Sequence, residues 1–164
     1  KAYVASAKND KSIDQISYMF NYDMTNDPKG FSTSSEDSRA LFQSIGAIAN
    51  KIDTDFKNSL SVGAGLHSDH QPFMLQGIPT GGGSGGGLPN GAGPCYHADC
   101  DGFNLVDEKG MKNTVRYGTM LLYGVADATE IKSKQLTDQE TKQFLIDKGL
   151  KEALQIAGDW RWKD

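Results

Sequence analysis

The chain has 164 residues, of which 37% are hydrophobic and 23% charged, and its net charge is -4 at pH 7. This length suits one domain with its own core. The acidic balance, without any basic stripe, gives no reason to expect a nucleic-acid partner. No run of about 18 apolar residues predicts a membrane span. The sequence lacks a signal-peptide pattern and begins at Lys1 in mid-pattern, which suggests a processed protein, an excised domain or a fragment.

The first part of the chain predicts a strand followed by a helix. Residues 16–24 are rich in β-branched and aromatic side chains and end in a turn-like segment, so we expect a buried strand with Asp23 at its carboxyl end. Residues 35–52 have helical periodicity, with Ser34 or Ser35 as candidate caps. The apolar face of this helix is expected to contain Leu41, Phe42, Ile45, Ile48, Ala49 and Ile52.

The middle of the chain is broken by glycines. Residues 59–66 predict a short strand that leads into a loop. Ser68 is then expected to cap a short helix with Pro72 in its first turn, and Gly77 to end it. Residues 81–93 are glycine-rich, which fits either a flexible linker or a surface loop beside a site. We favour the loop, because apolar structure resumes on both sides. This segment has no phosphate-binding motif.

The clearest helix covers residues 110–127, and its buried stripe is expected to contain Met111, Val115, Gly118, Thr119, Leu122, Val125 and Ala126. Thr137 and Glu140 form a T-x-x-E capping box at the start of another helix, which Gly149 ends. A last helical piece covers residues 151–157. Strands alternating with helices indicate the α/β class. We expect residues 1–128 to form the main domain and residues 129–164 a helical extension.

Asp23 is the first candidate site residue. An isolated Asp after a strand is usually a turn or capping residue. Here an apolar run leads directly into it, so its carboxylate requires a polar partner or a cation. Ligands in open α/β sheets gather at the carboxyl ends of strands, which is where Asp23 is predicted to lie.

The second candidate site is the segment from Cys95 to Cys100. In an oxidising compartment these cysteines would form a tight disulfide, which we favour; in the cytosol they would stay reduced. A zinc half-site is the remaining alternative, although the spacing is unusual for one. A closed ring would hold His97 in one orientation, as a metal ligand requires. The hydroxyl of Tyr96 is placed to donate to an oxyanion, unless Tyr96 is a core aromatic.

His67, Asp69 and His70 form a third cluster. The sequence H-S-D-H could bind a metal, but the two histidines are expected on opposite sides of a helix cap. Asp69 is explained as a first-turn acid. A catalytic triad that uses Ser68 is not supported, because no G-x-S-x-G elbow surrounds it. These three residues are therefore candidates for substrate contact or for support of metal ligands.

Three segments, taken in order, resemble the C-terminal half of the two-zinc aminopeptidases, relatives of glutamate carboxypeptidase and glutaminyl cyclase. The resemblance covers residues 1–127. The N-x-D-M strand end is present at residues 21–24, and the S-D-H-x-P-F…G-I-P segment at residues 68–79. The C-Y-H-x-x-C-D segment is present at residues 95–101, followed by N-L-V at residues 104–106.

The resemblance implies a mixed-sheet, three-layer α/β/α domain with two zinc ions at the carboxyl ends of its strands. Asp23 would bind one ion and His97 the other, and Tyr96 would stabilise the tetrahedral intermediate. Cys95 and Cys100 would form a disulfide, which with the family implies an extracellular or periplasmic protein. The implied reaction is removal of N-terminal residues from peptides by metal-activated water.

The family's first His, bridging Asp and adjacent Glu-Glu pair are not in this sequence, and His67 stands where relatives often have Arg. We therefore expect the isolated chain to bind zinc poorly and to be inactive. Its exposed sheet edge should pair with the missing N-terminal half or with another copy. The alternatives are a glutaminyl cyclase-like transferase and a non-catalytic binding module of the same fold.

Overall fold

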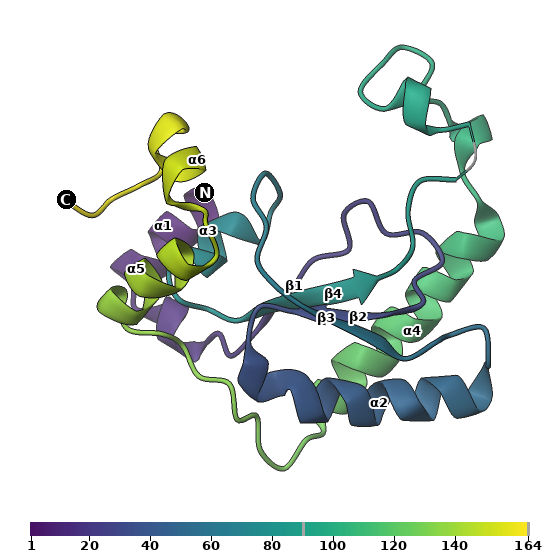
Figure 1. Cartoon of the computed structure of the whole chain (residues 1–164), viewed down its shortest axis with the longest axis horizontal. Helices are drawn as coiled ribbons and strands as arrows, with labels where there is room; N and C mark the ends of the chain where they lie inside the picture. The colour runs from purple at the N-terminus through teal and green to yellow at the C-terminus, as the bar shows by residue number, and fades with distance from the viewer. Residues whose placement is uncertain (90, 164) are drawn as a thin grey trace.

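The computed structural model describes residues 1–89 and 91–163 (Figure 1). The helices are α1 (Ala2–Asn9), α2 (Arg39–Ile52), α3 (Gln71–Met74), α4 (Glu108–Ala126), α5 (Asp138–Asp147) and α6 (Lys151–Ile156). The strands are β1 (Met19–Phe20), β2 (Gly30–Thr33), β3 (Ser59–Val62) and β4 (Thr80–Ser84). Short 3-10 turns are formed by Ser12–Gln15, Glu36–Ser38, Gly93–Cys95 and Phe103–Leu105. In this part of the chain no helix is both long and apolar enough to cross a membrane.

The four strands form one mixed sheet in the order β1-β4-β2-β3. Strand β4 runs parallel to β1 and antiparallel to β2, and β2 runs parallel to β3. The strands alternate with helices along the chain, so the expected α/β class and mixed sheet are confirmed.

The main core lies between the sheet and the pair of helices α2 and α4, which pack against each other below it in Figure 1. Its members are mostly large apolar and aromatic side chains that exclude water from this interface: Phe31, Phe42, Ile45, Ala49, Phe56, Tyr117, Leu121 and Val125. The face of β2 and β3 opposite this core carries serines, among them Ser32 and the exposed Ser59 and Ser61. One face of the sheet is therefore apolar and covered, and the other is small and polar.

The strand predicted over residues 16–24 is much shorter than expected. Only Met19–Phe20 pairs with β4, and both residues are half-buried rather than fully buried. The aromatic rings before Asp23 pack onto the side of the core instead, with Tyr18 and Phe20 stacked at 4.8 Å between centroids. The apolar run therefore reflects packing at a sheet edge, and Asp23 lies in an exposed turn after it.

The prediction of a loop across residues 81–93 is wrong for its first part, because residues 81–84 belong to β4, an inner strand of the sheet. Glycine is normally a poor strand residue. In β4, however, glycine is required, because neighbouring backbone atoms leave no room for a Cβ. A Cβ on Gly82 would lie 2.1 Å from the carbonyl oxygen of Asn21, and one on Gly81 would lie 2.7 Å from that of Ser32. Close packing of the backbones overrides the intrinsic preference.

The buried stripe predicted for α4 is largely wrong. Gly118 and Val125 are buried as expected, but Met111, Val115 and Leu122 are 53%, 64% and 46% exposed. The face that packs on the core is instead Gly110, Asn113, Tyr117, Gly118, Leu121 and Val125. Glycines allow the helix to approach closely: a Cβ on Gly118 would lie 3.1 Å from the ring of Tyr22. In α2, likewise, Phe42, Ile45 and Ala49 are buried, whereas Ile48 and Ile52 are 55% and 68% exposed.

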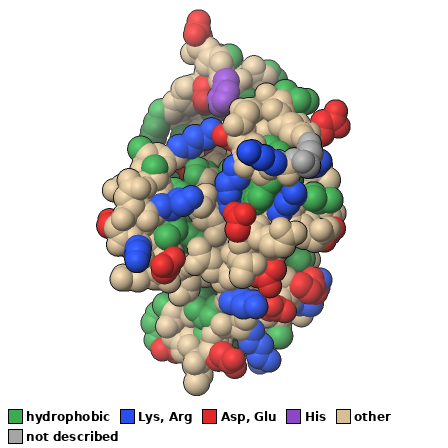
Figure 2. All heavy atoms as spheres, turned by 90° about the vertical axis from the view of Figure 1, so that its left-hand side faces the viewer, with side chains coloured by type: hydrophobic (Ala, Val, Ile, Leu, Met, Phe, Trp, Pro, Cys, Tyr) green, Lys and Arg blue, Asp and Glu red, His purple; other side chains and the backbone are tan. Residues whose placement is uncertain are grey.

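Residues 129–163, which the sequence predicts to be an extension, pack onto the end of the molecule that carries α1 and α3 (Figure 1). The predicted capping box of α5 is confirmed, since Glu140 N donates to Thr137 Oγ1 and Thr137 N to Glu140 Oε2. Buried Leu145 and Leu154 join Met74 and Leu75 in one apolar cluster. Figure 2 shows this end of the molecule, where acidic and basic side chains are mixed, with hydrophobic ones between them. The extension thus shares a core with α3.

Candidate functional site

Asp23 is held by side chains from the segment that precedes α3. Its Oδ2 accepts a hydrogen bond of 2.7 Å from Ser68 Oγ, and Ser68 Oγ in turn accepts one of 2.7 Å from Asn21 Nδ2. The same Asn21 nitrogen lies 3.2 Å from His70 Nδ1, and His70 Nε2 lies 3.0 Å from the carbonyl oxygen of Gly65. The sequence prediction that burial forces Asp23 to have a partner is wrong, because Asp23 is exposed, but Ser68 does donate to its carboxylate.

Ser68 does not cap α3, contrary to the sequence prediction. The residue at the N-terminal boundary of the helix is His70, which makes no side-chain capping bond, and Pro72 lies in the first turn as expected. The backbone carbonyl of Ser68 still accepts from Gln71 N. The hydroxyl of Ser68 makes no capping bond to the helix and instead donates to Asp23.

An open depression of about 350 Å³ lies beside this group. Asp23, Asn21 and His70 line it, and the rest of the lining is small and mostly polar: Thr25, Ser32, Thr33, Ser34, Ser61, Gly63, Ala64, Gly65, Thr80, Gly81 and Gly83. Small side chains leave room for a ligand or a chain segment over the sheet. The carboxylate of Asp23 is the acidic group among them.

The second candidate segment projects from the body of the molecule, as the teal loop that leads into α4 in Figure 1 shows. Cys95 and Cys100 form a disulfide with their Cα atoms 5.1 Å apart, so the favoured alternative for the two cysteines is confirmed. Within the ring His97 has a positive φ of 57°, and its imidazole stacks on Tyr96 at 4.0 Å between centroids. Both side chains are exposed, so Tyr96 is not a core aromatic.

His67 and Asp69 lie outside the hydrogen-bonded group around Asp23. His67 is exposed with a positive φ of 70°, and its backbone N–H donates to Gln71 Oε1. With the exposed Asp69 it lines a separate depression of about 370 Å³ that Lys1 and Asp159 also border. His70 is linked to Asp23 through Asn21 and Ser68. The structure thus divides the H-S-D-H cluster between two surfaces, and its role in substrate contact stays a prediction.

The described residues do not offer a complete zinc site. No three or more His, Cys, Asp or Glu side chains among residues 1–89 and 91–163 are grouped so that they could bind one metal ion. A tight zinc site needs at least three protein ligands. Asp23 and His97 come from separate segments and have no such companions among the described residues, so zinc binding through them requires ligands beyond this part of the chain.

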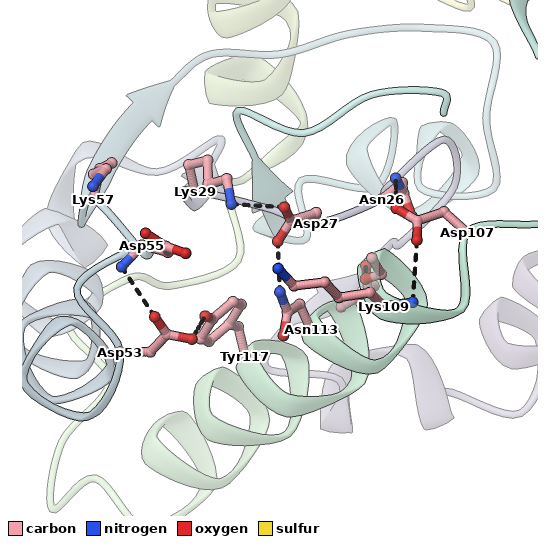
Figure 3. Close-up of polar contacts among 12 residues, drawn as sticks. Asn26, Asp27, Lys29, Asp53, Asp55, Lys57, Asp107, Lys109, Asn113 and Tyr117 are labelled. Atoms are coloured by element: carbon pink, nitrogen blue, oxygen red, sulfur yellow. Dashed lines mark hydrogen bonds and ion pairs between the residues drawn. The ribbon is translucent and has the colours of Figure 1, made fainter. Parts of the chain in front are cut away.

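A second polar group, which the sequence analysis missed, anchors the loop after Asp23 to α4 (Figure 3). Asp27 accepts from Lys29 Nζ at 2.7 Å and from Asn113 Nδ2 at 2.8 Å. Burial raises the pKa of Asp27, but these hydrogen bonds outweigh it and the pKa is lowered. Asn26 donates to Asp107, the residue that caps α4, whose pKa is lowered by hydrogen bonds from Gly110 N and Asn26. The T-N-D-P turn was the available signal, because Asn and Asp commonly bond to nearby backbone and caps.

A narrower pocket of about 250 Å³ lies where the extension meets the main domain. Its apolar lining includes Met74 and Ile78 from the main domain and Leu136 and Phe144 from the extension. The sequence offered no signal for it, because the pocket exists only where residues far apart in the chain meet. The extension therefore shapes the surface beside the sheet.

Comparison with known protein families gave one finding. The model of peptidase family M28 matches residues 1–121, which is most of the chain and includes Asp23, His70 and His97. No significant match was found among curated proteins or solved structures.

Proposed function

Because this chain belongs to peptidase family M28, we propose that it supplies part of the site of a two-zinc exopeptidase of the aminopeptidase type. Asp23 would bind one ion and His97 the other, with Tyr96 beside the reacting carbonyl. The observation that supports this most is the family match over the segments that carry both residues. The other ligands and the general base would come from polypeptide outside this sequence, since the described residues contain no group of three or more His, Cys, Asp or Glu side chains that could bind a metal ion.

Metal analysis and activity of a polypeptide that contains this sequence together with the missing ligands test the proposal. We expect two zinc ions per molecule and release of free amino acids from aminoacyl-anilide substrates. Asp23→Ala and His97→Ala should each reduce the zinc content and abolish hydrolysis. Asp14→Ala, a change to an exposed acid outside all the candidate site residues, is the matched control and should retain both zinc ions.

Two results would point to the alternatives. Formation of pyroglutamate from a peptide with N-terminal glutamine, without hydrolysis of anilides, would indicate a glutaminyl cyclase-like transferase. A protein without bound zinc would refute both enzymes and indicate a binding module. The chain of residues 1–164 by itself should bind zinc weakly and show no peptidase activity, because one ligand per ion is not enough.

The disulfide supports an oxidising location. Disulfides persist in secreted and periplasmic proteins and are rare in the cytosol, so we propose an extracellular or periplasmic enzyme that acts on peptides. Strands β1 and β3 are the edges of the described sheet. Unpaired strand edges invite pairing with further chain. We propose that one edge pairs with the missing half, and that the isolated chain self-associates there, which sedimentation at increasing concentration would detect.

A further inference from the structure

We propose that His70, Asn21 and Ser68 form a directional hydrogen-bond relay that orients the carboxylate of Asp23, so that all three are positioning residues. The proposal rests on the proposed function only in assigning a metal to Asp23. The relay joins two segments: Asn21 and Asp23 follow β1, and Gly65, Ser68 and His70 lie in the segment between β3 and α3. Each link is between 2.7 and 3.2 Å long.

The donors and acceptors of this relay can be assigned from its first member. The carbonyl oxygen of Gly65 can only accept, so the facing His70 Nε2 must carry a proton and donate. In the neutral imidazole the other ring nitrogen, Nδ1, is then an acceptor. The atom that faces it must be the donating Nδ2 of Asn21 rather than the carbonyl oxygen. The histidine therefore fixes the orientation of the Asn21 amide.

The same logic continues to Asp23. An amide nitrogen has two protons, and Asn21 directs the second to Ser68 Oγ. Because that hydroxyl oxygen accepts from Asn21, its own proton is available for Asp23 Oδ2 at 2.7 Å. If the Asn21 amide were rotated by half a turn, its oxygen would compete for the Ser68 proton. The bond to Asp23 thus depends on the side chain of His70, although the two residues are not in contact.

The relay has a consequence for ligand binding. Ser68 engages Oδ2 of Asp23 and leaves Oδ1 outside the relay, so the carboxylate presents one oxygen to a cation. Partners of this kind fix the orientation of ligating carboxylates and histidines, and their loss typically lowers metal affinity about 10–100-fold. Strand β4 also supports this arrangement. The Asn21 carbonyl oxygen packs against Gly82, and this contact holds the backbone that carries the Asn21 side chain.

The first test is nuclear magnetic resonance of the ¹⁵N-labelled chain, whose long-range ¹H–¹⁵N correlations show which ring nitrogen of a histidine carries the proton. The chain has three histidines, and His67→Gln and His97→Gln assign the signals of the other two. We expect His70 to carry its proton on Nε2, which faces the Gly65 carbonyl oxygen, and to have no proton on Nδ1, which faces Asn21 Nδ2. A proton on Nδ1, or on both nitrogens, would overturn the relay.

The second test compares Ser68→Ala, Ser68→Thr and Ser61→Ala. Ser68→Ala removes the hydroxyl and should shift the Asn21 side-chain amide signals, whereas Ser68→Thr keeps a hydroxyl and should restore them. Ser61→Ala changes an exposed serine in the same depression and should leave them unchanged. Unaltered Asn21 signals in Ser68→Ala would overturn the relay even if every variant is folded.

Zinc competition in the polypeptide with the complete ligand set separates this proposal from the proposed function. Ser68→Ala should weaken the affinity of one zinc ion about 10–100-fold, with recovery in Ser68→Thr. An unchanged affinity would refute the positioning role. Complete absence of zinc binding in the unsubstituted polypeptide would refute the proposed function instead, while the histidine spectrum still decides whether the relay exists.

Discussion

Gly82→Ala tests the most unexpected feature of the fold, the inner strand formed largely of glycine. The added Cβ would lie 2.1 Å from the carbonyl oxygen of Asn21, well below the 3.0 Å that such contacts essentially never undercut. The neighbour is backbone, so it cannot turn away as a flexible side chain would. The strand or the segment after β1 must therefore shift by nearly an ångström.

The expected cost follows from two opposing effects. Overpacking in a well-packed region costs about 1–3 kcal/mol and occasionally more. Replacement of Gly by Ala recovers about 0.4–1 kcal/mol by restricting the unfolded chain. We therefore expect a net loss of about 1–2 kcal/mol in the free energy of unfolding. For a domain of this size that corresponds to a decrease in Tm of about 2–8 °C.

Gly87→Ala is the matched control, because it lies in the same glycine-rich segment and its Cβ would meet no atom within 4 Å. Urea unfolding followed by circular dichroism gives both free energies, and the control should be unchanged or slightly more stable. If the free energies of unfolding of the two variants differ by less than about 0.5 kcal/mol, Gly82 is not packed against Asn21 and the reasoning fails. Gly82→Ala should also shift the Asn21 amide signals, since it displaces the backbone of that residue.

Three further predictions concern other parts of the molecule. Burial raises the pKa of Tyr22 to about 12, so its folded phenol stays neutral while the unfolded one ionises near pH 10; stability is full below pH 10 and lost as pH rises toward 12. Tyr22→Phe should remove this alkaline loss of stability, which amounts to about 1.3 kcal/mol between pH 9 and pH 11 in urea unfolding. Replacement of Cys95 and Cys100 by Ser should lower the unfolding free energy by no more than about 2 kcal/mol, as expected for a short loop. Asp138→Asn should cost less than about 1 kcal/mol and change the fluorescence of Trp162, whose indole donates to Asp138 at 2.7 Å.

Each of these has a control and a contradicting result. Tyr3 is 63% exposed, so Tyr3→Phe should leave the loss of stability at alkaline pH unchanged; equal effects of the two tyrosine changes would refute the burial argument. A loss well above 2 kcal/mol on removal of the disulfide would show that the projecting loop supports the core. Asp14→Asn, a change to an exposed acid, should not alter the tryptophan fluorescence, and an unaltered spectrum in Asp138→Asn would contradict the contact.

The sequence predicted the wrong buried face for α4, because contacts with residues far away in the chain decide which face is buried. Periodicity predicts the helix and a buried stripe that includes Met111, Val115 and Leu122, but these three side chains are exposed. The opposite face of α4 is buried for two reasons. Gly110 and Gly118 permit close packing of the helix. Tyr117 packs against Phe56, and its hydroxyl donates to Asp53. Those partners are remote in sequence.

The site shows the same division. Residue types and spacing made Asp23, His97 and the cysteine pair candidates, since an acid after an apolar run and a histidine between cysteines are local patterns; the roles of Asp23 and His97 stay predictions. The disulfide, whose half-cystines are close in sequence, is confirmed. Ser68 was predicted to cap a helix because that is the usual local role of such a serine. Its actual partner is Asp23, 45 residues away.

The sequence by itself determined the α/β class, the family segments and the helices with strong local signals, such as the capping box of Thr137 and Glu140. Those features depend on residues within a few positions of one another. Only the tertiary structure decided that glycines 81–83 form an inner strand, which face of α4 is buried, and that His70 and Ser68 orient Asp23. Each of these depends on contacts between distant segments, whose energies exceed the local preferences of the residues involved.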